Sequence, residues 1–405
     1  MAVPSPDEAR ATVLEAARPG PPEARALLAA GGRALAEAVH AGRDLPAFPQ
    51  SAMDGYALAA AEGAPAGARF RLAGTSRAGG PGAPLAPGEA ARIFTGAQVP
   101  EGATCVAPQE VVRTEGAQVE VCEAVPAGRH VRHAGSDVAA GQEALAAGTR
   151  LGPAALALLR ALGVEFVNVH RAPRVALVLS GDELCEDAAA LRPGQVLEAN
   201  SGGLRQALRE EGVELGSQRL ARDTEEAHVR ALGAALEESE LLLVTGGISV
   251  GDFDLVRPAL ERLGVETVFW RVAQRPGGPL YFGRRGAQLV FGLPGNPAST
   301  LVCWYEYVLP AVRRCLGLAE VRLPRVPARL GAGYRKRAEM EYFVRARLHR
   351  DGAELVVTPH AQQESHALRS FALAHALAVF PAGRERFGPG DTVDCDVLPG
   401  AGRLA

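Results

Sequence analysis

The spacing of hydrophobic and polar positions changes several times along the chain. Residues 1–42 have helical spacing in EARATVLEA and PEARALLAAGGRALAEAV, and the prolines of LPAFPQ end this pattern. Residues 43–138 carry Gly or Pro every few positions between short β-type runs such as ARFRLAG and QVEVCEAV. Residues 139–172 become helical again in PAALALLRALG. We predict a helical domain from residues 1–42 and 139–172, with a β-rich domain at 43–138.

Beyond residue 172 the pattern is that of alternating strands and helices. The apolar runs RVALVLSG, ELLLVTGG and QLVFGLPG alternate with amphipathic runs such as GLRQALREEG and EEAHVRALGAAL. This alternation is typical of a parallel sheet with helices on both faces, so residues 173–318 are predicted to form a doubly wound α/β domain. Residues 319–405 return to period-two runs such as EYFVRARL and HALAVFP, which predict a small β domain.

Composition and charge limit the classes of function. The chain has 405 residues, more than one core usually organises, and 47% of them are hydrophobic, as in globular proteins. A net charge of -3 provides no basic field for nucleic acid, and no apolar run reaches the ~18 residues that cross a bilayer. The first twenty residues lack a secretory signal. We expect a cytoplasmic protein that binds neither nucleic acid nor membranes.

Three loops follow the predicted parallel strands and are candidates for ligand binding. In open α/β sheets ligands bind outside the carboxyl ends of the strands. Glycines in such loops let backbone N–H groups face a phosphate or oxyanion, although tight turns also need glycine for steric reasons alone. The carboxylates of Glu183, Asp252 and Asp254 would repel an anion unless a cation such as Mg²⁺ intervened. The three loops are residues 180–184, 245–254 and 292–299.

Several residues in this region have a structural interpretation as well. Asp223 precedes a helical run with Glu226 three residues later, which is a pattern typical of a helix N-cap. Pro297 suits a first helical turn and leaves Asn296 or Ser299 near exposed amides, as a cap or a phosphate seat. No Ser-His-Asp or Cys-His arrangement is visible among nine scattered histidines, so a hydrolase is poorly supported.

The same loops resemble one family. VALVLSGDEL is similar to a strand ending in TGDEL, VTGGISVGDFD to SGGvSvGdyD and FGLPGNPAS to GLPGNPvS, all in the MoeA/gephyrin E-domain family of molybdopterin molybdenumtransferases. LPAFPQSAMDGYA and IFTGA resemble two further motifs of that family outside the α/β region. The resemblance implies a central MogA-like α/β domain, a helical segment, a β-rich domain and a C-terminal β-barrel.

The resemblance also implies the residues of the site. RVAQRPGGP resembles the pattern kxxxKPGkP and has Gly278 where the second lysine is usual, while Arg345 and Ser365 match a C-terminal pattern more loosely. The residues implied in catalysis are Asp54, Thr95, Asp137, Glu183, Asp223 and Asp254, of which Glu183, Asp223 and Asp254 would hold Mg²⁺. Those implied in substrate or anion binding are Ser180, Gly181, Gly246, Gly247, Ser249, Arg271, Arg275, Pro294, Gly295, Asn296 and Pro297.

The activity implied is insertion of molybdate into adenylated molybdopterin with release of AMP. The resemblance further implies a homodimer whose cleft brings Asp54 and Thr95 of one subunit to Glu183 and Asp254 of the other, and a transient contact with the upstream adenylyltransferase. Two alternatives stay open at this point. One is a pterin-binding scaffold without catalysis, and the other is a molybdopterin adenylyltransferase.

Overall fold

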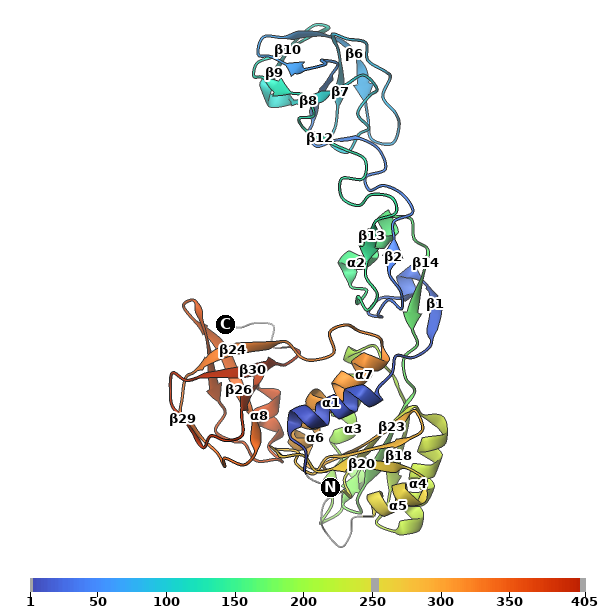
Figure 1. Ribbon diagram of the computed structural model, residues 1–405, viewed down its shortest axis with the longest axis vertical. Helices are drawn as coiled ribbons and strands as arrows, with labels where there is room; N and C mark the ends of the chain where they lie inside the picture. Colours follow the sequence, from blue (N-terminus) through green and yellow to red (C-terminus); the bar gives the residue numbers. More distant parts are fainter. Residues whose placement is uncertain (1–2, 249–254, 401–405) are drawn as a thin grey trace.

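The computed structural model describes residues 3–248 and 255–400, and its shape is elongated. In Figure 1 the β-rich domain lies at one end of the molecule, and the α/β domain lies beside the C-terminal domain at the other end. A narrow arm joins the two ends. None of the helices in the described ranges is long and apolar enough to cross a membrane.

The central sheet of the α/β domain is mixed. In the order β18-β15-β19-β23-β22-β20 the first four strands are parallel, as predicted, but β22 pairs antiparallel with both β23 and β20. The prediction of a wholly parallel sheet is therefore wrong at this edge. β22 and β23 are joined by a two-residue turn at Gly286, which is too short for the crossover that parallel strands need. The strands are β15 Val175–Ser180, β18 Leu215–Ala221, β19 Leu241–Thr245, β20 Glu266–Trp270, β22 Tyr281–Arg285 and β23 Gln288–Leu293.

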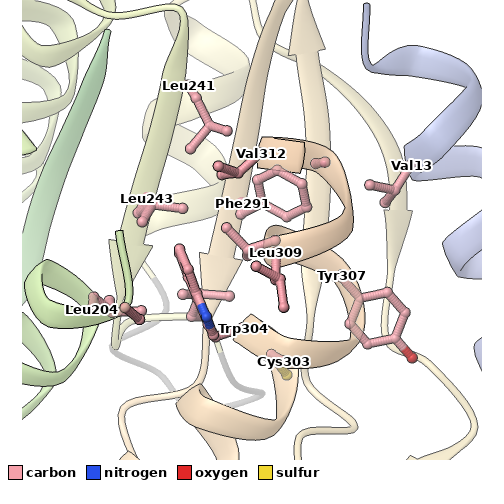
Figure 2. Close-up of a cluster of buried hydrophobic side chains, with 14 of the residues drawn as sticks. Val13, Leu204, Leu241, Leu243, Phe291, Cys303, Trp304, Tyr307, Leu309 and Val312 are labelled. Carbon is pink, nitrogen blue, oxygen red and sulfur yellow. The ribbon is translucent and has the colours of Figure 1, made fainter. Parts of the chain in front are cut away.

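Helices cover both faces of this sheet, as the alternation of strands and helices predicted. Leu241 and Leu243 of β19 contribute to one buried cluster, whereas Leu242 and Val244 contribute to another, because successive side chains of a strand point to opposite faces. Figure 2 shows the first cluster, where Trp304 lies between strand and helix residues. Its helices are α1 Pro6–Ala16, α3 Asn200–Glu210, α6 Pro297–Cys303, the π-helical turn Trp304–Val308 and α7 Leu309–Cys315; α4 Glu225–Glu238 and α5 Val256–Arg262 cover the other face.

The N-terminal segment differs from its prediction. α1 forms as expected, capped by Ser5 and Glu8, but it packs against α7 and the π-helical turn of the α/β domain. The helix predicted over the run that begins at Pro22 is wrong, since this run contains β1 and β2, which pair with strands more than 100 residues later. Pro21, Pro22 and two consecutive glycines interrupt helix formation there, and strand pairing satisfies the backbone instead. The arm is built from β1 Pro22–Ala26, β2 Val39–His40, β13 Glu143–Leu145, α2 Pro153–Ala161 and β14 Phe166–His170.

The two remaining domains are β structures. The β-rich domain holds a six-stranded sheet in the order β8-β4-β7-β6-β10-β9, and the C-terminal domain holds a barrel closed by the pairing of β26 with β28. The first comprises β4 Gly55–Leu58, β6 Arg69–Ser76, β7 Glu89–Ile93, β8 Cys105–Pro108, β9 Val112–Glu115 and β10 Gln118–Val121. The barrel comprises β24 Arg325–Leu330, β26 Glu341–Asp351, β27 Glu354–Pro359, β28 Ala376–Phe380 and β30 Thr392–Val397, with α8 Leu368–Ala372 beside it.

Candidate active site

A cavity of about 690 Å³ opens at the carboxyl ends of β15, β19 and β23, and we call it the carboxylate cavity. The location agrees with the general rule for ligand sites of open α/β sheets. Nine of the predicted site residues line it: Ser180, Gly181, Glu183, Asp223, Gly246, Gly247, Gly295, Asn296 and Pro297.

Two glycines of this cavity, Gly181 and Gly246, are favoured by close neighbours and by their backbone conformation. A Cβ atom on Gly181 would lie 2.3 Å from the Glu183 carboxylate, which folds back over the loop. A Cβ on Gly246 would lie 2.5 Å from the carbonyl oxygen of Ser180, and Gly246 has a φ of 82°. Such approaches and left-handed backbone favour glycine. The steric explanation for these glycines therefore holds, and the loops are close-packed around Ser180.

Asp223 does not cap α4, so that interpretation is wrong. Thr224 is the N-cap, and its side chain accepts a hydrogen bond from the backbone N–H of Ala227. Asp223 instead accepts a hydrogen bond from the backbone N–H of Asp182 at 3.2 Å, while Asp182 accepts one from the backbone N–H of Asp223 at 3.3 Å. The reciprocal pair joins the two loops and leaves Asp223 on the wall that also carries Glu183.

The predicted metal-binding residues lie partly outside the described chain. Glu183 and Asp223 line the same cavity, whereas Ser249, Asp252 and Asp254 fall in residues 249–254, outside the described residues. Within the described ranges no group of three or more His, Cys, Asp or Glu side chains is arranged to hold a metal ion.

A second cavity, of about 680 Å³, adjoins the first at Gly247, Gly295 and Asn296, which line both; we call it the arginine cavity. Arg271, Arg275 and Pro294 line it, so the structure groups the predicted basic residues with the glycine loops. The Arg271 guanidinium lies over the Trp270 ring at 4.8 Å, and that of Arg275 lies 5.9 Å from the Tyr342 ring.

The positive charges of Arg271 and Arg275 are not neutralised by ion pairs within the described part of the chain. Neither Arg271 nor Arg275 forms a salt bridge there, so both guanidinium groups keep donors for an anion. Gly278 also lines this cavity, and a Cβ there would lie 3.0 Å from the carbonyl oxygen of Gln274. The residue that stands in place of a family lysine is thus closely packed against the backbone.

A buried hydrogen-bond network holds the loop that carries Arg275. The Gln274 side chain donates to the carbonyl oxygen of Pro276 at 3.0 Å and accepts a hydrogen bond from the Tyr307 hydroxyl. The Cys303 thiol donates to the carbonyl oxygen of Gly277 at 3.4 Å. The helical segment from α6 to the π-helical turn therefore anchors two successive carbonyl groups behind the arginine cavity.

The C-terminal domain completes both cavities. His366 and Leu368 line the carboxylate cavity, Ser365 lines the arginine cavity, and the carbonyl oxygen of Ser365 accepts a hydrogen bond from Ala298 at the start of α6. Arg345 is fully buried behind this loop and donates to the carbonyl oxygens of Gln362 and Glu364.

Ser180 and His228 form a pair that the sequence did not reveal. The Ser180 hydroxyl lies 2.8 Å from Nε2 of His228, and Nδ1 of His228 lies 2.9 Å from the carbonyl oxygen of Thr224. This pair is not a Ser-His-Asp triad, because a backbone carbonyl rather than a carboxylate holds the imidazole. A histidine in the apolar register of α4 was the signal, since it must find a buried partner. Asn200, which donates to the carbonyl oxygen of Gly295, was also missed.

Asp54 and Thr95 lie together in the β-rich domain, at the far end of the molecule from both cavities (Figure 1). The backbone N–H and the hydroxyl of Thr95 donate to one Asp54 oxygen at 2.7 and 2.8 Å. The hydrogen bond from the Thr95 backbone N–H has the larger effect and that from the Thr95 hydroxyl the next, and both lower the pKa of Asp54. The Asp54 carboxylate is therefore ionised at neutral pH. Asp137 is exposed in the segment that leads back to the arm, and its backbone N–H donates to Leu45. Within one chain these residues do not meet Glu183.

Models of three family regions match the chain in order. "MoeA N-terminal region (domain I and II)" matches residues 4–163, "Probable molybdopterin binding domain" matches residues 176–314, and "MoeA C-terminal region (domain IV)" matches residues 327–398. Together these matches span the arm, the β-rich domain, the α/β domain and the barrel.

Individual relatives match over most of their length. The chain is 34% identical over 383 residues to a molybdopterin molybdenumtransferase of Nostoc sp., covering 92% of this chain and 88% of the relative. It is 31% identical over 392 residues to a protein of the same name from Haemophilus influenzae, covering 96% of each. The crystal structure of a molybdopterin biosynthesis MoeA protein from Pyrococcus horikoshii superposes with a TM-score of 0.84 at 25% identity, covering 98% of this chain and 100% of that chain.

Proposed function

Because this chain belongs to the MoeA family of molybdopterin molybdenumtransferases, we propose that it inserts molybdate into adenylated molybdopterin and releases AMP. One observation carries the proposal at the level of chemistry. The carboxylate cavity and the arginine cavity adjoin and share Gly247, Gly295 and Asn296 as walls. A ligand with a diphosphate and a separate oxyanion would therefore find two differently charged compartments in contact.

The carboxylate cavity suits a hard cation shared with a substrate. Mg²⁺ in phosphate-handling sites is commonly held by one or two carboxylates together with substrate phosphates. Glu183 and Asp223 supply two carboxylates on one wall, and Asp182 fixes the loop of Asp223 through its backbone contacts. We propose that these two residues hold Mg²⁺, which would supply neutralisation of diphosphate charge when bound. The third expected ligand, Asp254, stays a prediction.

The arginine cavity suits molybdate. A guanidinium presents N–H donors in a planar fork that matches two oxygens of a tetrahedral oxyanion. Arg271 and Arg275 bring two such groups to the same cavity, and their aromatic neighbours limit their rotation. Their role would be to hold the oxyanion beside the dithiolene of the pterin, and no protein nucleophile is required for this positioning.

We also propose that the working site is shared between two subunits of a homodimer. Asp54 and Thr95 form a hydrogen-bonded pair in which the Asp54 carboxylate is ionised. The pair has no described contact with the rest of the site in its own chain. Exposed apolar side chains flank both halves: Met53 and Phe94 lie beside this pair, and Val196, Leu197 and Leu368 line the carboxylate cavity. Apolar rims of this kind are typical of surfaces that are covered in an assembly.

Assembly of the cofactor from defined components tests the proposal. Purified protein is mixed with adenylated molybdopterin, molybdate and Mg²⁺, and both AMP and molybdenum-containing cofactor are measured. We expect the two products in equal amounts, with no AMP when molybdate and Mg²⁺ are omitted. Substrate that stays intact under all conditions would favour the scaffold alternative. A parallel reaction with ATP and molybdopterin tests the adenylyltransferase alternative and is expected to give no adenylated pterin.

A further inference from the structure

The buried pair of Ser180 and His228 lies at the wall of the carboxylate cavity. Ser180 is the last residue of β15 and lines the cavity, although only 5% of its surface is exposed. His228 lies in α4 and is fully buried, and its Nε2 atom is 2.8 Å from the Ser180 hydroxyl. Gly247 of the following glycine loop lies close to the hydroxyl, since a Cβ on Gly247 would be 2.7 Å from it. The hydroxyl therefore has little freedom to choose another partner.

The hydrogen-bond network determines which atom of the pair carries the proton. The carbonyl oxygen of Thr224 lies 2.9 Å from Nδ1 of His228, and a carbonyl oxygen can only accept. In a neutral imidazole the single proton must therefore lie on Nδ1, which leaves Nε2 as an acceptor. The hydroxyl hydrogen of Ser180 then points to Nε2, and only oxygen lone pairs remain for the cavity.

We propose that Ser180 is a specificity residue that accepts a hydrogen bond from a donor group of the bound organic ligand, and that His228 is the positioning residue that imposes this direction. The donor would be a sugar hydroxyl or a ring N–H group. The phosphate groups of such a ligand are largely deprotonated at neutral pH, so they gain little from an acceptor and bind elsewhere in the cavity. The resemblance implied substrate or anion binding for Ser180, and the proposal narrows this role to binding of the organic part of the substrate.

The proposal rests on the proposed function only for the class of ligand, a phosphorylated nucleotide or pterin. Its test measures binding rather than turnover, so the two can fail separately. A protein that inserts no molybdate can still show the binding pattern described below. A protein with full insertion activity can equally lack that pattern.

The experiment compares three ligands by calorimetry in the presence of Mg²⁺: AMP, a phosphorylated pterin and inorganic sulfate, a tetrahedral anion that carries no hydrogen at neutral pH. Ser180→Ala removes the acceptor, and we expect at least one organic ligand to bind about tenfold more weakly, the usual effect of one lost hydrogen bond. Sulfate, which has no donor to lose, should bind within about twofold of wild type. Ser180→Thr keeps the hydroxyl and should restore the affinity for the organic ligand.

A second variant tests the direction of the hydroxyl. His228→Leu removes the acceptor at Nε2, so the Ser180 hydroxyl can donate into the cavity, and sulfate affinity should rise several-fold. A merely structural role of His228 would weaken all three ligands together. The proposal is overturned if Ser180→Ala weakens sulfate binding as much as that of the organic ligands, if it weakens neither organic ligand, or if neither organic ligand binds the wild-type protein. The Ser180 variants decide the matter even where His228→Leu fails to fold.

Discussion

Glu306 is a buried carboxylate that pairs with an arginine. It lies in the π-helical turn, is 4% exposed, and contacts Arg10 of α1 at 2.5 Å. Burial, followed by the nearby Asp396 carboxylate, raises the pKa of Glu306 to about 8, and Arg10 opposes this only in part. The geometry fits this direction, because Arg10 also serves Asp7 and one guanidinium is shared between two carboxylates. Ionising the Glu306 carboxyl group therefore costs more free energy in the folded protein than in an unfolded chain.

This raised pKa predicts a loss of stability as the pH rises. Between the ordinary value of 4.5 and about 8 the folded state binds a proton that the unfolded state does not, so Glu306 lowers the free energy of unfolding progressively over this interval. The slope contributed is at most about 1.4 kcal/mol per pH unit. Glu306→Gln mimics the protonated form and should flatten the curve of unfolding free energy against pH from 5.5 to 8, measured in urea. Glu354→Gln, in an exposed pair with Arg329, should leave the slope of the wild type.

Glu183 and Asp223 can be tested by the same isosteric logic. Each carboxylate is expected to contribute charge to a Mg²⁺ site, so Glu183→Gln and Asp223→Asn should each reduce the rate of AMP release by at least about tenfold at 1 mM Mg²⁺ and shift the Mg²⁺ dependence to higher concentration. Unfolding free energies should stay near that of wild type. Glu226 lies about one turn from Asp223 on the exposed face of α4, so Glu226→Gln serves as the matched control. Turnover with unchanged Mg²⁺ dependence in Glu183→Gln would remove it from the site.

The role of a residue was predictable from the sequence where it depends on the local sequence, and was missed where it depends on a contact with a remote residue. Glu183, Asp223 and the cavity glycines lie in loops whose flanking strands are plain in the sequence, so their grouping at one sheet edge was predictable. The Ser180–His228 contact joins residues 48 apart and depends on how α4 packs on β15. The cap at Thr224 was missed because Asp223 and Thr224 are both good capping residues, and the partner of Asp223 lies 41 residues earlier.

At the scale of elements, buried strands and long amphipathic helices were the best predicted. β15, β19 and β23 are buried on both faces and read as unbroken apolar runs. The arm strands were missed because residues 23–26 of β1 are all helix-forming types, while the pairing partner of β1, β14, is remote in sequence. Tertiary pairing overrides helix propensity there, since propensity differences are only a fraction of a kcal/mol per residue.

The glycine loop after β19 gives a prediction at this scale. Gly246 has a φ of 82° and would place a Cβ 2.5 Å from Ser180, whereas Gly264, after α5, has a φ of 80° and no atom within 4 Å of such a Cβ. Both Gly→Ala substitutions force an L residue into left-handed backbone at about 1–2 kcal/mol. Gly246→Ala must also move the loop, so it should lose more unfolding free energy and most AMP release, while Gly264→Ala keeps its activity. Equal losses in the two variants would show that the cavity tolerates the extra atom.

At the scale of the whole molecule, the separation of Asp54 from Glu183 is the feature with the largest consequence. At one end of the molecule the ionised Asp54 carboxylate accepts hydrogen bonds from Thr95, and the other end holds both cavities. The arm between them has few buried residues, grouped in two small clusters. A second subunit that presents its β-rich domain would unite the two sets of residues.

Subunit mixing tests this arrangement. Asp54→Ala and Glu183→Gln chains are each expected to be inactive, but a heterodimer of the two would contain one cleft with both changes and one with neither. Random exchange puts about half of the dimers in this class, so activity should recover to roughly a quarter of wild type if clefts act independently. Exchange is followed by native mass spectrometry. Complete exchange without recovery would show that each cleft is built within one chain.

The position of α1 has a consequence for how the chain folds as it is made. α1 ends at Ala16, yet its packing partners, the π-helical turn and α7, begin at Trp304 and Leu309. At roughly 5–20 residues per second, the first helix leaves the ribosome on the order of 15–60 s before they exist. During that time Ala9 and Val13 have no surface to cover them, while the arm and the β-rich domain can already pair their strands. Nascent chains halted before residue 300 should therefore carry a folded β-rich domain together with a protease-sensitive N-terminus that a chaperone can bind.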